Sequence, residues 1–264
     1  MLKLIRCELW KYKRNKAIPL LTMMAALFPL ALVIMTRSRI DGAENRRALY
    51  SYYDYVFGSN MVYSFILFLP CLIGSVGAVL FFSERDSDTF KNLRTVPVTC
   101  AQLVMAKLIV LYLWAVLYAV LSTVSITVFC AALNYRTVYD FPFKILVSLL
   151  EGILIVSVSL PAVVMVIYFS QNYVLSILLA FSYSIFHWFA LVLFSGHERI
   201  ISWMPLNTGL FWVSYLLEYR KKVLFGEAFS LVQWSEHLRV LVSLGMIFAI
   251  SVTLILRFYK KWSR

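Results

Sequence analysis

The sequence predicts an all-α membrane protein that crosses a bilayer six times. Of its 264 residues, 62% are hydrophobic and only 14% are charged, whereas soluble domains carry roughly 25% charged residues. Six apolar stretches approach or exceed the about 20 residues that a helix needs to cross the hydrocarbon core. The charged residues lie mainly at the chain ends and between these stretches, so the net charge of +12 indicates membrane topology signals rather than a nucleic-acid surface.

The predicted membrane helices follow one another along a single transmembrane domain, residues 1–264. They cover residues 17–35, 61–82, 108–133, 145–169, 173–194 and 238–256.

Only Ser170, Gln171 and Asn172 separate the fourth predicted span from the fifth, so we expect a tight helical hairpin there. Pro161 lies inside the fourth predicted span and is expected to kink it or to leave one carbonyl free.

The distribution of Lys and Arg predicts the orientation of the spans. These residues are densest before the first span, and more of them follow the last span and lie between the second and third. The same side of the membrane therefore holds both termini and the larger share of positive charge. By the positive-inside rule, both termini are predicted to be cytoplasmic.

Residues 2–16 predict a basic amphipathic helix at the membrane surface. Apolar residues recur at spacings of three and four: Leu2, Ile5, Leu9 and Tyr12. Basic residues are available for the opposite face, which is typical of an interfacial helix. Two interpretations stay open, a plain anchor and an elbow helix that also contacts a cytoplasmic partner. The partner interface would use four residues of this helix: Ile5, Glu8, Leu9 and Lys11.

Two outer connections are rich in aromatic residues. The longest, residues 195–237, contains a predicted amphipathic segment over 203–226 that is expected to dip into the outer leaflet. The first, residues 36–60, holds several tyrosines that we expect to anchor at the membrane interface. They are Tyr50, Tyr52, Tyr53 and Tyr55.

Glu151 and His187 lie inside the fourth and fifth predicted spans. An ionisable residue within a span is a functional hypothesis, here a contact on a substrate path. The alternative for His187 is a hydrogen-bonded packing residue. The sequence has no His-Glu-x-x-His, Gly-x-Ser-x-Gly or Walker A motif and no Cys-x-x-Cys pair. We therefore expect no metal site and no catalytic residues, and nucleotide hydrolysis would have to come from another protein.

The loop between the second and third predicted spans is the most charged stretch after the N-terminus. Its acidic cluster suits the start of a short helix and Pro97 suits a turn. A short mixed-charge helix of this kind, tied to a span on each side, can dock into a cleft of a soluble partner and transmit movement. The predicted coupling residues are Glu84, Asp86, Asp88, Thr89, Lys91, Leu93 and Pro97.

This loop resembles that of the membrane subunits of type-2 ABC exporters. Their motif reads Glu-x-x-x-Gly-Thr, then an apolar position, a Pro-hydrophobic-Ser/Thr step and a Lys that opens the third span. The matching residues are Glu84, Thr89, Leu93, Pro97, Thr99 and Lys107. Asp88 stands where glycine is usual, which departs from the motif but keeps its spacing. The six spans, the elbow and the unequal loops extend the resemblance over nearly the whole chain, and together they imply a type-2 ABC exporter architecture.

The opening segment, residues 2–11, further resembles the permeases of lantibiotic-immunity and bacitracin-resistance transporters. That resemblance implies two permease copies, identical or homologous, and a separate ATPase dimer that binds ATP and magnesium. It also implies expulsion of antimicrobial peptides from the bacterial cytoplasmic membrane, with membrane lipids as neighbours and no cofactor in this chain. A type-2 exporter of a drug, sodium, a glycan or a lipid stays open, as do a membrane-embedded enzyme and a sensor or interaction protein.

Overall fold

The computed structural model describes residues 1–40, 45–86, 98–169, 172–194, 201, 203–226 and 234–262. Over these ranges the chain is helical almost throughout and contains no strand. The principal helices are α1 (Leu2–Arg14), α2 (Ala17–Thr36), α3 (Arg46–Tyr63), α4 (Leu69–Asp86), α6 (Cys100–Leu133), α7 (Phe141–Tyr168), α8 (Tyr173–Leu193), α10 (Pro205–Phe225) and α11 (Trp234–Trp262).

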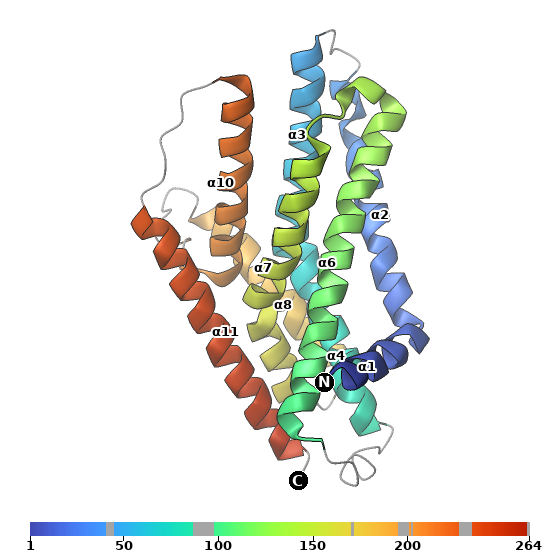
Figure 1. The fold of residues 1–264 in the computed structure, drawn as a ribbon, viewed down its shortest axis with the longest axis vertical. Helices are drawn as coiled ribbons and strands as arrows, with labels where there is room; N and C mark the ends of the chain where they lie inside the picture. The colour runs from blue at the N-terminus through green and yellow to red at the C-terminus, as the bar shows by residue number, and fades with distance from the viewer. Residues whose placement is uncertain are drawn as a thin grey trace.

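Six helical stretches are long and apolar enough to cross a membrane, which confirms the predicted all-α, six-span fold. They are Ala17–Arg39, Arg46–Phe82, Cys100–Leu133, Phe141–Tyr168, Tyr173–Leu193 and His237–Lys261. The helices run side by side, and both termini lie at the same end of the bundle (Figure 1). The elbow helix α1 lies across that end, while the tops of α3 and α10 mark the opposite end.

The second span differs most from its prediction, because its helix begins at Arg46 rather than near residue 61. The helix α3 passes through a π-helical segment, Ser64–Phe68, directly into α4. Residues 36–60 were predicted to form an outer connection, but polar residues in this range have partners on other helices. Asn60, for example, donates to the Ser122 hydroxyl over 3.0 Å. Tyr52 and Tyr53 are buried, so the prediction that they anchor at the membrane interface is wrong.

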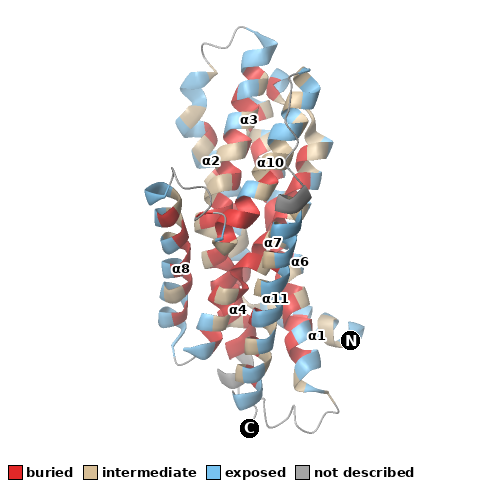
Figure 2. Cartoon of the chain, turned by 90° about the vertical axis from the view of Figure 1, so that its left-hand side faces the viewer, coloured by how far each residue is buried: buried red, intermediate tan, exposed pale blue. Residues whose placement is uncertain are grey.

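Burial is concentrated where α4, α6 and α7 meet, while α8 and α11 expose much of their surface (Figure 2). The exposed positions on these outer helices are largely apolar, as expected for side chains that face lipid. Asn172 caps α8 by accepting from the Val174 amide over 3.2 Å, although residues 170–171 of the predicted turn lie outside the described residues. Gly226 follows the last residue of α10 and caps that helix in a left-handed conformation, with φ +67°.

A glycine allows the closest approach of α6 to α7. A Cβ atom at Gly152 would lie 2.6 Å from the Cα atom of Val116, closer than unstrained atoms pack. At Gly245 of α11, by contrast, an added Cβ would meet no atom within 4 Å. The spacing of the two central helices therefore depends on a residue without a side chain.

We expect Gly152→Ala to destabilise the folded chain by roughly 1–3 kcal/mol, the usual cost of forcing an extra methyl into a packed core. Thermal denaturation of the purified protein in detergent measures this effect. The matched control, Gly245→Ala, should leave the midpoint unchanged or raise it. Equal midpoints for the two variants would show that α6 and α7 do not pack as described.

Candidate functional site

A buried ammonium group joins three helices at the end of the bundle that holds the termini. The Lys107 Nζ atom of α6 donates to the Glu8 carboxylate of α1 over 3.1 Å and to the Leu80 carbonyl of α4 over 2.7 Å. The Lys107 and Glu8 side chains are only 0% and 2% exposed. We call Glu8, Lys107 and the Leu80 carbonyl the inner junction.

The start of α6 positions Lys107. Thr99 and Gln102 form a capping box, in which the Thr99 hydroxyl accepts from the Gln102 amide and the Gln102 side chain accepts from the Thr99 amide. Because the helix begins at Cys100, Lys107 lies two turns inside α6. Its long side chain can therefore reach between α1 and α4.

The predicted coupling loop adjoins the inner junction in sequence. Leu80 lies four residues before Glu84, and Glu84 and Asp86 belong to the last turns of α4. The side chains of Glu84 and Asp86 are outside the described residues, as are Asp88, Thr89, Lys91, Leu93 and Pro97 altogether. Their docking role therefore stays a prediction.

The four predicted elbow residues face different surroundings. Ile5 is half-buried against the core, whereas Leu9 is 38% exposed. Lys11 donates to Glu8 over 3.0 Å and is itself half-exposed. The Glu8 carboxylate points inward and belongs to the inner junction, so only Leu9 and Lys11 offer substantial side-chain surface to a partner. Contact between the elbow and an ATPase stays a prediction.

Glu151 lies deep in the bundle. It is the eleventh residue of α7, about 15 Å along the helix from its N-terminal end. Its residue is 4% exposed, and the described part of the chain gives its carboxyl group no hydrogen bond or ion pair. Gly152 beside it permits the tight contact with α6. An unpaired carboxyl group inside a span is a functional hypothesis, so the role of Glu151 on a substrate path stays a prediction.

His187 is buried as well, but it has a partner. Its Nδ1 atom lies 2.8 Å from the Tyr183 carbonyl one turn earlier in α8, and the tautomer protonated at Nδ1 donates to it. The imidazole also packs against the Tyr183 ring, with centroids 4.4 Å apart. This geometry favours the packing interpretation over a contact with substrate.

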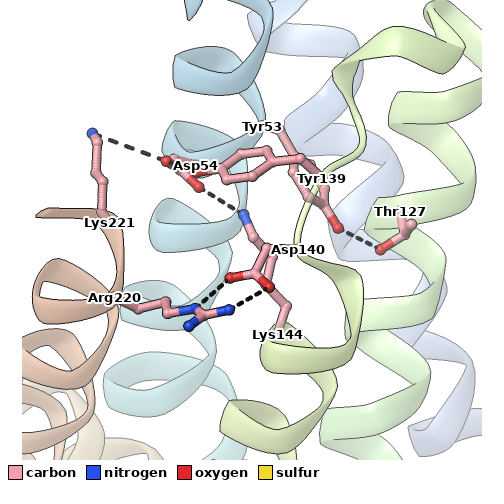
Figure 3. Close-up of polar contacts among 8 residues, drawn as sticks. All are labelled: Tyr53, Asp54, Thr127, Tyr139, Asp140, Lys144, Arg220 and Lys221. Atoms are coloured by element: carbon pink, nitrogen blue, oxygen red, sulfur yellow. Dashed lines mark hydrogen bonds and ion pairs between the residues drawn. The ribbon is translucent and has the colours of Figure 1, made fainter. Parts of the chain in front are cut away.

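A second set of charged residues lies at the opposite end of the bundle and was not predicted. Figure 3 shows side chains from α3, α7 and α10 converging on Asp54 and Asp140. We call the following residues the outer cluster: Asp54, Tyr139, Asp140, Lys144, Arg220 and Lys221.

Asp54 of α3 is the centre of the outer cluster. Lys144 of α7 donates to its carboxylate over 2.7 Å, and the Tyr139 hydroxyl donates to it as well. Lys221 of α10 lies 4.0 Å away. Burial and then the Asp54 carboxylate raise the pKa of Tyr139, so its hydroxyl stays protonated and keeps donating. The Lys144 ammonium also lies 3.8 Å from the centre of the Tyr53 ring.

A second ion pair connects α10 to the start of α7. The Arg220 guanidinium donates to both Asp140 oxygens, over 2.9 and 3.2 Å. These hydrogen bonds raise the pKa of Arg220. A cavity of about 320 Å³ lies beside the pair, and Asp54, Lys144 and Lys221 are among its lining residues. The outer ends of three helices are thus held by charges that face a cavity.

Sequence reasoning missed the outer cluster because each member has an ordinary local explanation. Arg220 and Lys221 looked like topology charges near a helix end, and Asp54 fell in a presumed loop. The pairing of residues 80 to 90 positions apart appears only when the helices are assembled.

Comparison with known proteins identifies a family for this chain. Residues 4–187 match a family model described as ABC-2 family transporter protein, a range that runs from α1 into α8 and contains the inner junction and Glu151. A search of curated proteins gives no match to the chain.

We expect Glu8→Ala to release α1 from the bundle, because it removes the Glu8 carboxylate from the buried Lys107 ammonium. Removing one partner of a buried ion pair costs about 3 kcal/mol, equivalent to about 100-fold faster amide exchange if α1 opens locally. Hydrogen–deuterium exchange over residues 2–14 measures this change. Lys11→Ala, which removes only the half-exposed partner of Glu8, should change exchange much less. Unchanged protection in Glu8→Ala would contradict the inner junction.

At the outer cluster, Asp54→Asn should destabilise the fold by roughly 3 kcal/mol, because it leaves the nearly buried Lys144 unpaired. The double variant Asp54→Asn/Lys144→Met should recover most of that loss, since it removes the stranded charge as well. Thermal denaturation of Asp54→Asn, Lys144→Met and the double variant, each compared with the unchanged chain, decides the matter. A double variant as unstable as the sum of its single changes would show that the two residues are not paired.

Proposed function

This chain belongs to the ABC-2 family of transporter proteins, and from that premise we propose that it is the permease subunit of an exporter of antimicrobial peptides. Its six apolar spans supply the membrane component of a transporter, and a separate ATPase supplies the energy. The observation that carries the proposal is the inner junction. It fastens the elbow and two spans to one another beside the loop that would receive the ATPase.

Coupling would begin at the loop formed by residues 84–97. In the proposed cycle, two ATPase subunits close on ATP and magnesium, and the loop moves with them. Because the Leu80 carbonyl and Glu8 both bind the Lys107 ammonium, movement of the end of α4 is passed to α6 and to α1. The helices then shift as units, which is how small displacements at a docking site become large changes at packed interfaces.

The substrate proposal rests on the apolar outer surface of the bundle and on the buried carboxyl group of Glu151. The outward faces of α2, α8 and α11 are apolar, so an amphipathic peptide can approach through the membrane and needs no charged channel. Within the bundle, Glu151 is a carboxyl group with no hydrogen-bond partner in the described part of the chain. We propose that it meets a cationic group of the peptide when α7 moves away from α6. His187 then supports the packing of α8 rather than the peptide.

The proposed assembly contains two permease copies and two ATPase subunits in the bacterial cytoplasmic membrane. Both termini and the loop 84–97 would face the cytoplasm, because the ATPase must reach α1 and that loop from one side. The outer cluster would then face the exterior and hold α3, α7 and α10 together at the exit end. Two copies are expected because the resemblance to lantibiotic-immunity and bacitracin-resistance permeases implies them.

The coupling role is tested by Glu84→Arg in the complex purified with its ATPase. We expect ATPase activity stimulated by an antimicrobial peptide to fall by about tenfold, within the usual range of coupling between sites. The matched control is Glu218→Arg, a charge reversal on α10 at the opposite end, which should leave stimulation nearly unchanged. Full stimulation in Glu84→Arg, with the complex intact, would contradict coupling through this loop.

The substrate is tested with the same complex in vesicles. A cationic amphipathic peptide should stimulate ATP hydrolysis, and Glu151→Gln should weaken that stimulation without lowering the basal rate. Stimulation by a drug, a glycan or sodium instead of the peptide would assign the chain to another exporter of the same family. Failure of the chain to co-purify with any ATPase would contradict the proposal as a whole.

A further inference from the structure

A groove lies between the elbow helix and two membrane spans. It has a volume of about 730 Å³, within the range of small-molecule sites. Its lining comes from three helices: Leu9, Tyr12 and Lys13 of α1, Ile18, Pro19, Thr22 and Met23 of α2, and Val110, Leu113, Trp114, Leu117 and Leu121 of α6. We call this feature the elbow groove. It is separate from the outer cluster and from Glu151.

The length of the elbow groove matches one leaflet of a bilayer. Its lining on α6 runs from Val110 to Leu121, eleven residues further along the helix, which corresponds to about 16 Å. The hydrocarbon core is about 30 Å thick, so one leaflet contributes about 15 Å. Along this length the α6 wall is entirely apolar. An acyl chain that lies along α6 would fill it from the surface to the bilayer midplane.

The polar groups of the elbow groove are concentrated at its α1 end. The Tyr12 hydroxyl is buried and has no hydrogen-bond partner in the described part of the chain. Burial raises the pKa of Tyr12, so this hydroxyl is a permanent donor. Lys13 beside it is exposed and forms no ion pair with any described residue. A buried donor without an acceptor is costly, so a ligand oxygen that reached this hydroxyl would be stabilised there.

The third polar side chain of the elbow groove is already engaged. The Thr22 hydroxyl donates to the Ile18 carbonyl over 2.8 Å and accepts from the Trp114 indole over 3.0 Å. These bonds hold α2 against α6 and set the width of the groove. Only Tyr12 and Lys13 are therefore left to recognise a ligand, and both of them favour an anion.

We propose that the elbow groove binds one anionic phospholipid from the leaflet on the side of α1. The Lys13 ammonium and the Tyr12 hydroxyl receive the phosphate of the headgroup, and an acyl chain lies along Leu113, Leu117 and Leu121. The lipid completes the packing between α1 and α6, next to the inner junction. Lipid composition would thereby influence how firmly the elbow helix is held.

Native mass spectrometry of the delipidated full-length chain tests the site without substrate or ATPase. The probes are dioleoyl phosphatidylglycerol and dioleoyl phosphatidylcholine, added separately. We expect one tightly bound phosphatidylglycerol and weaker binding of the zwitterionic lipid. Lys13→Gln should weaken phosphatidylglycerol binding by about fivefold, the effect of one basic residue at a lipid surface. Tyr12→Phe, which removes only the hydroxyl, should weaken it by a similar factor.

Lys3→Gln is the matched control, because Lys3 lies on α1 but does not line the elbow groove. It should bind phosphatidylglycerol within about twofold of the unchanged chain, since one charge away from the headgroup contributes little in detergent. Equal losses in Lys3→Gln and Lys13→Gln would reduce the site to general surface charge. Binding of a cationic peptide that excludes the lipid, or dimers cross-linked through Leu113→Cys, would assign the groove to substrate or to a second copy and overturn the proposal.

Discussion

The end of the bundle that holds the termini depends on a buried positive charge, that of Lys107. Lys107 lies where a lone ammonium group would be strongly disfavoured, so the chain has to bring a carboxylate and a carbonyl to it. Glu8 arrives from the elbow and Leu80 from the end of the second span. The position of α1 is therefore set by charge neutralisation as well as by the affinity of its basic face for lipid. An amphipathic helix with no such tie would rest on the membrane and move independently of the spans.

The two ends of the bundle are held in different ways. At the inner junction both charged partners are almost fully buried, which favours movement of α1, α4 and α6 as one unit. In the outer cluster the Lys144 side chain is 4% exposed, whereas Arg220 is 40% exposed and Lys221 is 48% exposed, so the contacts of α10 can break and re-form at smaller cost than the Lys144–Asp54 pair. Movement of the loop 84–97 would thus be passed through the inner junction toward the end of the bundle where the contacts of α10 can break.

Hydropathy predicted the six spans because crossing the bilayer imposes length and composition directly on the sequence. It failed over residues 46–60, where Asp54 and Asn60 resemble loop residues although their partners lie on other helices. The amphipathic pattern found the elbow, but it placed Glu8 at a partner interface because no local signal links it to Lys107. Pairs formed across 90 or more positions depend on how helices pack, which periodicity along one helix does not report.

The most direct test is a double-mutant cycle on Glu8 and Lys107 in the vesicle-reconstituted complex, reading peptide transported per ATP hydrolysed. The variants are Glu8→Gln, Lys107→Met and both together. If the inner junction transmits movement as a unit, each single change should lower this ratio and the double change should lower it no further than the worse single change. Independent, multiplicative losses would contradict the account, as would a ratio unaffected by Glu8→Gln.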